Sequence, residues 1–311
     1  GRGRGRGRGG RGGASDKAPD VTFSVEIGAK NGGHTAPVCA LCVAGEQLFT
    51  GAKDGFVKVW HIVEGNKTGE LQMGGEVASL CAEGSFVFAG LTSGIIKCIS
   101  TADGSMRDMT GHTGAVNALA VAGEHLFSGG QDATIRAWKY DAAAQTFALL
   151  GVMQGHSAPV QTLAAVAGRL FSGALDGAVG VWDAANGTQL QMLAGHQQAV
   201  TKVLNWMDHA ISCDMGGVIC VWGRQEDAAG NPVPDSPFAG KFQFPEGGAG
   251  AAGNSAAYVT MCGTADGEGK PVLLCANPLE GAVRILELPN FVDRGVITER
   301  QEVKALAAAG E

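Results

Sequence analysis

The chain has 311 residues, of which 45% are hydrophobic and 17% charged, so it is long and apolar enough to bury a sizeable core. Its net charge is -7, and removing the five arginines found between Gly1 and Gly13 leaves -12 for the rest. Such an acidic body argues against non-specific nucleic-acid binding, which depends on neutralising phosphates. No apolar run reaches the roughly 18 residues of a membrane-spanning helix, so we expect no membrane segment.

Residues 1–20, GRGRGRGRGGRGGASDKAPD, are rich in Arg and Gly. This composition cannot bury enough apolar surface to offset the entropy lost on ordering, so we expect a disordered tail. Alternating Gly and Arg places guanidinium groups on a flexible backbone, which can bind RNA by charge and by stacking on bases. The candidate RNA contacts are Arg2, Arg4, Arg6, Arg8 and Arg11. The alternative is a solubilising tail without RNA contact.

The rest of the chain, residues 21–311, contains an internal repeat. In four copies a Gly-His pair is followed at one constant spacing by a Ser or Thr and then by a Trp. These copies are His34-Thr50-Trp60, His112-Ser128-Trp138, His156-Ser172-Trp182 and His196-Ser212-Trp222. The first three also share an Asp at a constant spacing from the His, namely Asp54, Asp132 and Asp176. A period of roughly 40 residues with Gly-His at one end and Trp at the other is typical of a propeller built from four-stranded blades.

The repeats fall at about 34–64, 73–103, 112–142, 156–186, 196–223 and 256–288, and Val21–Ile27 alternates like a strand before them. Several copies depart from the pattern. The second has Met73, Ala89, Ser93 and Ile99 in the His, Ser, Asp and Trp places, and the fifth has Gly216 in the Asp place. The sixth lacks the His and has Leu286 in the Trp place. Within the long connection Arg224–Ala257, Lys241–Phe244 is predicted to be an outer strand.

The C-terminal segment Glu302–Glu311 aligns with Ala115–Glu124 without a gap. It therefore has the pattern of the first strand of a seventh, partial repeat over about 299–311. We expect an all-β, seven-bladed propeller with six full blades and an incomplete seventh that lacks its second and third strands.

These repeats resemble those of the WD-repeat family over about residues 34–311. The resemblance implies that Val21–Ile27 completes the last blade and closes the ring. It also implies that three polar sets are buried and hydrogen-bonded. They are His34-Thr50-Asp54-Trp60, His112-Ser128-Asp132-Trp138 and His156-Ser172-Asp176-Trp182. In this family the Gly-His loops and the turns between the second and third strands share one rim. The exposed candidates for partner binding there are Thr35, Lys53, Thr113, Gln131, Ser157, Leu175 and Gln197.

Three other motifs have a chemical alternative. His112, Ser128 and Asp132 have the residue types of a catalytic triad, but the same set occurs three times and no G-x-S-x-G motif is present. Cys39 and Cys42 form a C-x-x-C inside a predicted strand, where positions three apart point to opposite faces, and no second pair completes a metal site. Gly267–Lys270 is followed by Pro271, so a turn is favoured over a phosphate loop. We therefore predict no enzyme activity and no metal site. The eight cysteines are expected to be reduced and buried.

The segment Lys270–Gly295, KPVLLCANPLEGAVRILELPNFVDRG, and the weak second repeat are similar to plant and algal CCCH-type zinc-finger WD-repeat proteins. In those proteins a C-x8-C-x5-C-x3-H finger precedes the propeller. No such finger occurs in this sequence, so we expect no cofactor. Zinc would be expected only if a finger lies outside this sequence. The absent finger and the incomplete last repeat indicate a fragment of a longer protein.

The resemblance implies a non-enzymatic scaffold that binds protein or peptide partners in an RNA-associated context. The alternative is an RNA-binding protein that contacts RNA through the Arg-Gly tail and, in a full-length form, a zinc finger. We expect a monomer inside the cell, in the nucleus, the cytoplasm or both.

Overall fold

The computed structural model describes residues 32–143, 146–166, 168–229, 231–233, 235–244, 258–277, 281–298 and 303–307. The tail of residues 1–20 and the predicted strand Val21–Ile27 lie outside these ranges. Within them the chain forms six antiparallel sheets of four strands each and contains no helix, so nothing there could cross a membrane as a helix.

Each sheet uses four strands that are consecutive in the sequence, and we call these sheets blades one to six. Blades one and two comprise β1 (Val38–Ala44), β2 (Gln47–Ala52), β3 (Phe56–His61), β4 (Lys67–Gln72), β5 (Val77–Glu83), β6 (Phe86–Leu91), β7 (Ile96–Ser100) and β8 (Met106–Met109). Blades three and four comprise β9 (Val116–Ala122), β10 (His125–Gly130), β11 (Ile135–Asp141), β12 (Thr146–Met153), β13 (Val160–Val166), β14 (Arg169–Ala174), β15 (Ala178–Asp183) and β16 (Gln189–Ala194). Blades five and six comprise β17 (Val200–Trp206), β18 (His209–Asp214), β19 (Ile219–Arg224), β20 (Phe238–Phe244), β21 (Thr260–Ala265), β22 (Pro271–Asn277), β23 (Ala282–Glu287) and β24 (Val292–Thr298).

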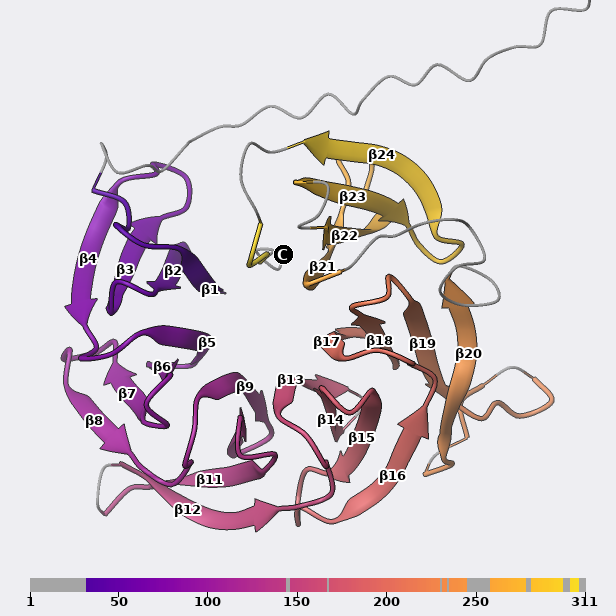
Figure 1. The fold of residues 1–311 in the computed structure, drawn as a ribbon, viewed down its shortest axis with the longest axis horizontal. Helices are drawn as coiled ribbons and strands as arrows, with labels where there is room; N and C mark the ends of the chain where they lie inside the picture. The colour runs from indigo at the N-terminus through magenta and orange to yellow at the C-terminus, as the bar shows by residue number, and fades with distance from the viewer. Residues whose placement is uncertain are drawn as a thin grey trace, which may run out of the picture.

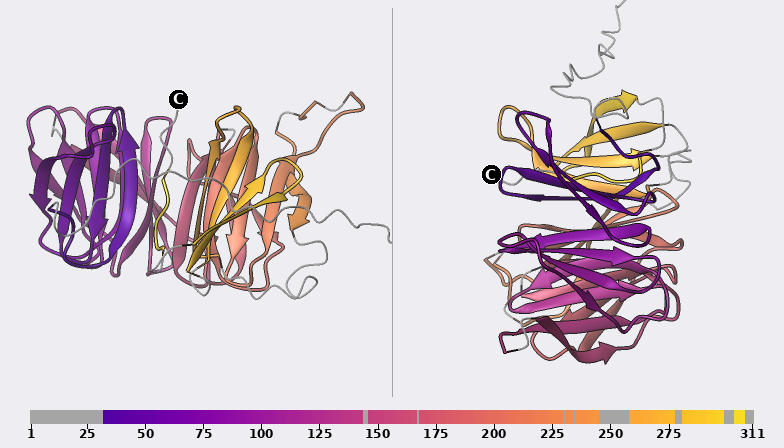
Figure 2. Two further views of the ribbon diagram at one scale, coloured as in Figure 1. Left: turned by 90° about the horizontal axis from the view of Figure 1, so that it is seen from above. Right: turned by 90° about the vertical axis from the view of Figure 1, so that its left-hand side faces the viewer.

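The blades follow one another around a common axis, with the first strand of each blade innermost (Figure 1). Seen from the side, the sheets stand next to each other with their faces packed together (Figure 2). This is the arrangement of a β-propeller, and the predicted outer strand Lys241–Phe244 is confirmed as part of β20.

The predicted seventh, incomplete blade is not found among the described strands. Residues 303–307 belong to the predicted strand Glu302–Glu311, yet they adopt no strand. A strand is defined by pairing with a neighbour, and this segment has no strand partner in the part of the chain that the structure describes. It lies near the centre of the ring, between β1 and β21 (Figure 1).

Close approach between neighbouring blades depends on a glycine in the second strand of blades one to four. A Cβ atom on Gly129 would lie 2.6 Å from Cγ1 of Val160, and one on Gly173 would lie 2.4 Å from Cγ1 of Val200. No side chain fits at such distances, so only glycine lets the next blade pack this closely. The equivalent pairs in blades one and two are Gly51 with Val77 and Gly90 with Val116.

Candidate functional site

Blade three shows how the polar set of one repeat is connected. The indole Nε1 of Trp138 donates to Oγ of Ser128 over 2.8 Å, and this hydroxyl lies 2.8 Å from Nε2 of His112. Nδ1 of His112 is 3.0 Å from both carboxylate oxygens of Asp132. An ionised carboxylate only accepts hydrogen bonds, so Nδ1 carries the proton and Nε2 accepts from the serine. Every polar atom of the set is thereby paired around a neutral histidine.

The other two predicted sets have the same geometry. Nε2 of His34 lies 2.7 Å from Oγ1 of Thr50, and Nε2 of His156 lies 2.7 Å from Oγ of Ser172. The Trp60 and Trp182 indoles donate to these hydroxyls over 2.9 and 2.7 Å, and the histidine-to-aspartate distances are 2.9 Å to Asp54 and 3.1 Å to Asp176.

Blade five contains a fourth set that the sequence spacing missed. Nε2 of His196 lies 2.6 Å from Oγ of Ser212, and this hydroxyl accepts from the Trp222 indole over 2.7 Å. The carboxylate comes from Asp214, whose Oδ2 lies 2.9 Å from Nδ1 of His196. Asp214 comes shortly before the regular position, Gly216, and is almost fully buried. The set in blade five is therefore complete despite the irregular sequence.

The second blade fills the same space with apolar side chains. Met73, Ala89 and Ile99 are buried in one hydrophobic cluster, while Ser93 is exposed. Replacing all partners of a polar set by apolar groups leaves no buried atom without a hydrogen bond. Blade two is therefore stabilised by packing.

The aspartates also fix the loops at one end of the propeller. Asp132 accepts from the backbone N–H of Thr113 in the loop before β9 and of Thr134 in the turn between β10 and β11, each over 3.1 Å. Asp54 and Asp176 make the equivalent bonds to the N–H groups of Thr35, Phe56, Ser157 and Ala178. One carboxylate thus ties two loops together in each of these blades.

The charge state of these groups follows from their surroundings. Burial alone raises the pKa of Asp132, but hydrogen bonds from Thr134, His112 and Thr113 outweigh it and lower the pKa to about 2. Burial, together with the charge of Arg136, lowers the pKa of His112 despite the opposing effect of the Asp132 carboxylate. At neutral pH the aspartate is therefore charged and the histidine neutral.

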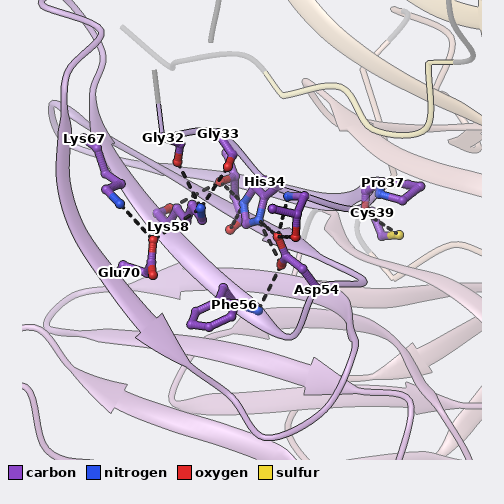
Figure 3. A network of polar contacts seen from close by, with 12 residues as sticks. Gly32, Gly33, His34, Pro37, Cys39, Asp54, Phe56, Lys58, Lys67 and Glu70 are labelled. Carbon is purple, nitrogen blue, oxygen red and sulfur yellow. Dashed lines mark hydrogen bonds and ion pairs between the residues drawn. The ribbon is translucent and has the colours of Figure 1, made fainter. Parts of the chain in front are cut away.

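In blade one a lysine side chain holds the backbone directly before His34, next to the polar set of that blade (Figure 3). Nζ of Lys58, a buried residue of β3, donates to the carbonyl oxygens of Gly32 and Gly33, each over 2.9 Å. It also lies 3.3 Å from the carboxylate of Glu70 on β4. Hydrogen bonds from Lys67 and Lys58 lower the pKa of Glu70. This anchor was not predicted, because backbone carbonyls leave no pattern in the sequence.

The loops held by the aspartates form a rim, which we define as the loops before each first strand together with the turns between second and third strands. All seven predicted partner-binding residues are exposed there: Thr35, Lys53, Thr113, Gln131, Ser157, Leu175 and Gln197. In blades one to five the first turn residue after the second strand donates its N–H to the loop before the first strand, as Leu175 does to Pro159 over 3.0 Å and Met215 to Ala199 over 3.0 Å. The side chains of Leu175 and Met215 are 46% and 45% exposed. Met215 is thus an apolar rim residue that the sequence prediction missed.

The remaining motifs carry no assembled chemistry. The hydroxyls of Ser128, Ser172 and Ser212 are fully buried and each also accepts an indole N–H, so no substrate can reach them. All eight cysteines are free thiols, Cys39 and Cys42 included. Gly267–Lys270 lies in the turn between β21 and β22. No group of three metal-binding side chains occurs within the described ranges.

Comparison with known proteins agrees with this geometry. The profile of the family described as "WD domain, G-beta repeat" matches residues 28–61 and 103–139. The chain carries WD repeats. A solved structure described as "Structure of U3-55K" resembles this WD-repeat propeller with a TM-score of 0.65 and 19% identity, over 83% of this chain and 79% of that chain. At this identity the likeness supports the fold alone. No curated protein matches the chain.

Proposed function

We propose that this WD-repeat propeller is a non-enzymatic scaffold that binds protein or peptide partners at its rim. The observation that carries the proposal is the tethering of exposed side chains by the carboxylates of the polar sets. Asp132 and Asp176 each fix a loop and a turn whose outer side chains, such as Gln131 and Leu175, point to solvent. Such a rigid surface binds without a large entropic cost of ordering.

The apolar rim residues Leu175 and Met215 give a direct test. We would compare the proteins captured by the full chain, by the double variant Leu175→Asp/Met215→Asp and by Met207→Asp. Met207 lies in the turn between β17 and β18, at the opposite end of β18 from Met215, and is 76% exposed. Partners held by the rim are lost from the double variant and kept by Met207→Asp. Identical capture by all three proteins would argue against the rim as the binding surface.

A second candidate function is RNA binding through the Arg-Gly tail, either by the protein alone or within a larger RNA-associated assembly. The tail arginines Arg2, Arg4, Arg6, Arg8 and Arg11, set against an acidic body, favour it. Deleting residues 1–13 should release bound RNA at a lower salt concentration than the full chain requires. Equal retention of RNA at every salt concentration would reject this function.

We further propose that the ring has a seventh blade position. We also propose that the protein belongs to the CCCH-type zinc-finger WD-repeat group, and that it is a monomer located inside the cell. The gapless alignment of Glu302–Glu311 with Ala115–Glu124 supports the seventh position. The likeness of Lys270–Gly295 supports the group. Sequencing the full transcript tests both, because it shows whether a zinc finger and the remaining strands of a blade are encoded.

A further inference from the structure

A lysine of blade five occupies a position between blades where blades one to four have small side chains. The second strand of blades one to four contains the glycine that lets the next blade pack closely. One residue of the first strand pairs with this glycine, and the equivalent pair exists in blade five. Ala40, Ser79, Ala118 and Thr162 face Gly51, Gly90, Gly129 and Gly173 in this way. In blade five the same pair is Lys202 and Cys213. The first four are buried against the next blade, so Lys202 places a long cationic side chain at a position otherwise used for packing.

Lys202 lines a cavity at the centre of the ring, with a volume of about 120 Å³. A single water needs only roughly 10–15 Å³ of such volume, so the cavity has room for a molecule of several atoms. Its walls come from the innermost strands of all six blades and from residues 304–306. Two lysines, Lys202 and Lys304, are among the described lining residues, and no aspartate or glutamate is.

The ammonium group of Lys202 has no counter-ion within the described part of the chain, because no hydrogen bond or ion pair joins it to another described residue. The titratable groups around it are the thiols of Cys213, Cys262 and Cys81. Burial raises the pKa of all three, to about 12 for Cys213 and about 11 for Cys81, so these thiols are neutral at pH 7. Loss of solvation in turn lowers the pKa of Lys202. Lys202 is half-buried, and an unpaired cation that has lost part of its hydration is costly, so an anion beside it lowers that cost.

Two polar side chains of the same cavity are available as donors. Gln161 on β13 and Thr260 on β21 line the cavity, and their side chains make no hydrogen bond to any described residue. Thr162 beside them accepts from the N–H of Val203 over 3.0 Å, which leaves its hydroxyl hydrogen free to donate. A cation with several neutral donors and no competing carboxylate is the donor set that suits a small oxyanion.

We propose that the central cavity binds a small tetrahedral oxyanion of the phosphate or sulfate type, with Lys202 as its cation and Gln161 and Thr260 as hydrogen-bond donors. This site is separate from the rim and does not depend on the scaffold function. The charge of the anion pairs with Lys202, and its oxygens accept from the amide and the hydroxyl.

Calorimetric titration of the full chain with sodium phosphate at constant ionic strength tests the proposal. We expect binding by the parent protein and by Lys139→Met, whose exposed lysine pairs with Glu124 over 2.9 Å far from the cavity. Lys202→Met should bind at least tenfold more weakly. This change removes an unpaired charge and keeps an unbranched side chain of nearly the same length, so the melting temperature should not fall. No binding by the parent protein, or equal binding by Lys202→Met, would overturn the proposal.

Further titrations test a second residue of the site, in a variant that keeps Lys202, and the chemical type of the ligand. Gln161→Met keeps Lys202 and should weaken phosphate binding several-fold, and unchanged affinity would remove Gln161 from the site. Sulfate should bind like phosphate, while acetate should bind at least tenfold more weakly because it offers two oxygens instead of four. Acetate binding as tight as phosphate binding would contradict a tetrahedral site.

Discussion

Asp214 hydrogen-bonds His196 over 2.9 Å at a sequence separation of 18, whereas Asp132 reaches His112 at a separation of 20. The backbone explains how both positions serve one histidine. Asp214 aligns with Gly130 of blade three, where an added Cβ would lie 2.4 Å from Nδ1 of His112. The position thus lies directly beside the histidine ring, and the ring and the side chain must lie further apart in blade five than the blade-three backbone would place them, which leaves 2.9 Å between Oδ2 of Asp214 and Nδ1 of His196.

Replacing Asp214 by alanine should destabilise the protein as much as Asp132→Ala does. Both changes leave the Nδ1–H of a buried histidine without an acceptor, which costs about 1–3 kcal/mol. Asp214 also accepts from the N–H groups of Gly216 and Val218, each over 2.9 Å, so the turn loses two bonds as well. Urea denaturation gives the free energy of unfolding for each variant.

Asp208→Ala is the matched control, because Asp208 is an exposed aspartate in the turn between β17 and β18. It should change stability by less than about 0.5 kcal/mol. The double variant Asp214→Gly/Gly216→Asp moves the carboxylate to the regular spacing and should recover part of the loss. An Asp214→Ala protein as stable as the parent would show that the fourth polar set contributes nothing.

Acid should destabilise the propeller through these sets. The pKa of His112 is lowered on folding, so the unfolded chain binds a proton more readily and stability falls as the pH drops below about 6.5. The pKa of Asp132 falls from 3.8 to about 2, so its contribution is present above pH 3.8 and is lost as the pH falls toward 2. After allowance for solvent screening, this aspartate contributes about 1–2 kcal/mol.

Unfolding free energies of the parent and Asp132→Asn, measured from pH 7 to pH 2.5, check this pH dependence. The asparagine variant should have a lower free energy of unfolding than the parent at pH 7. It should lose less stability below pH 4, because it has no carboxylate to protonate. Asp208→Asn should follow the parent at every pH. Parallel curves for the parent and Asp132→Asn would contradict a lowered pKa of Asp132.

The thiols should react slowly in the folded protein. Burial raises the pKa of Cys42, Cys213 and Cys220 to about 12, and that of Cys98 to about 11. Only the thiolate is nucleophilic, so these thiols carry almost no reactive form at pH 8. A thiol-specific chromogenic reagent should count eight cysteines in denaturant, and these four should react orders of magnitude more slowly in the native state. Rapid native labelling of Cys213 or Cys220 would show that the blades open.

The regular spacing of the repeats predicted the blades and three polar sets, because each set lies within one repeat at fixed intervals. It missed Asp214, although the acidic residue directly after Cys213, where the other repeats with a Gly-His pair have Ala or Gly, is a visible signal. It also missed Lys58, whose partners are backbone carbonyls. Lys202 was missed because only the strand register, which pairs it with Cys213, shows that it occupies the position of a small side chain in blades one to four. Contacts between repeats thus depend on register and on bulges that a one-dimensional spacing does not contain.

Adding one methyl group at Gly173 should destabilise the propeller, because it forces blades four and five apart. A Cβ atom there would lie 2.4 Å from Cγ1 of Val200 and 2.8 Å from Cγ2 of Thr162, and both partners are buried. Overpacking of this kind costs about 1–3 kcal/mol. Gly151→Ala is the matched control, because Gly151 also lies within a strand, β12, and an added Cβ would meet nothing within 4 Å. Differential scanning calorimetry should show a lower melting temperature for Gly173→Ala and an unchanged or slightly higher one for Gly151→Ala. Equal melting temperatures for the two variants would mean that neighbouring blades can shift to accept a side chain at this position.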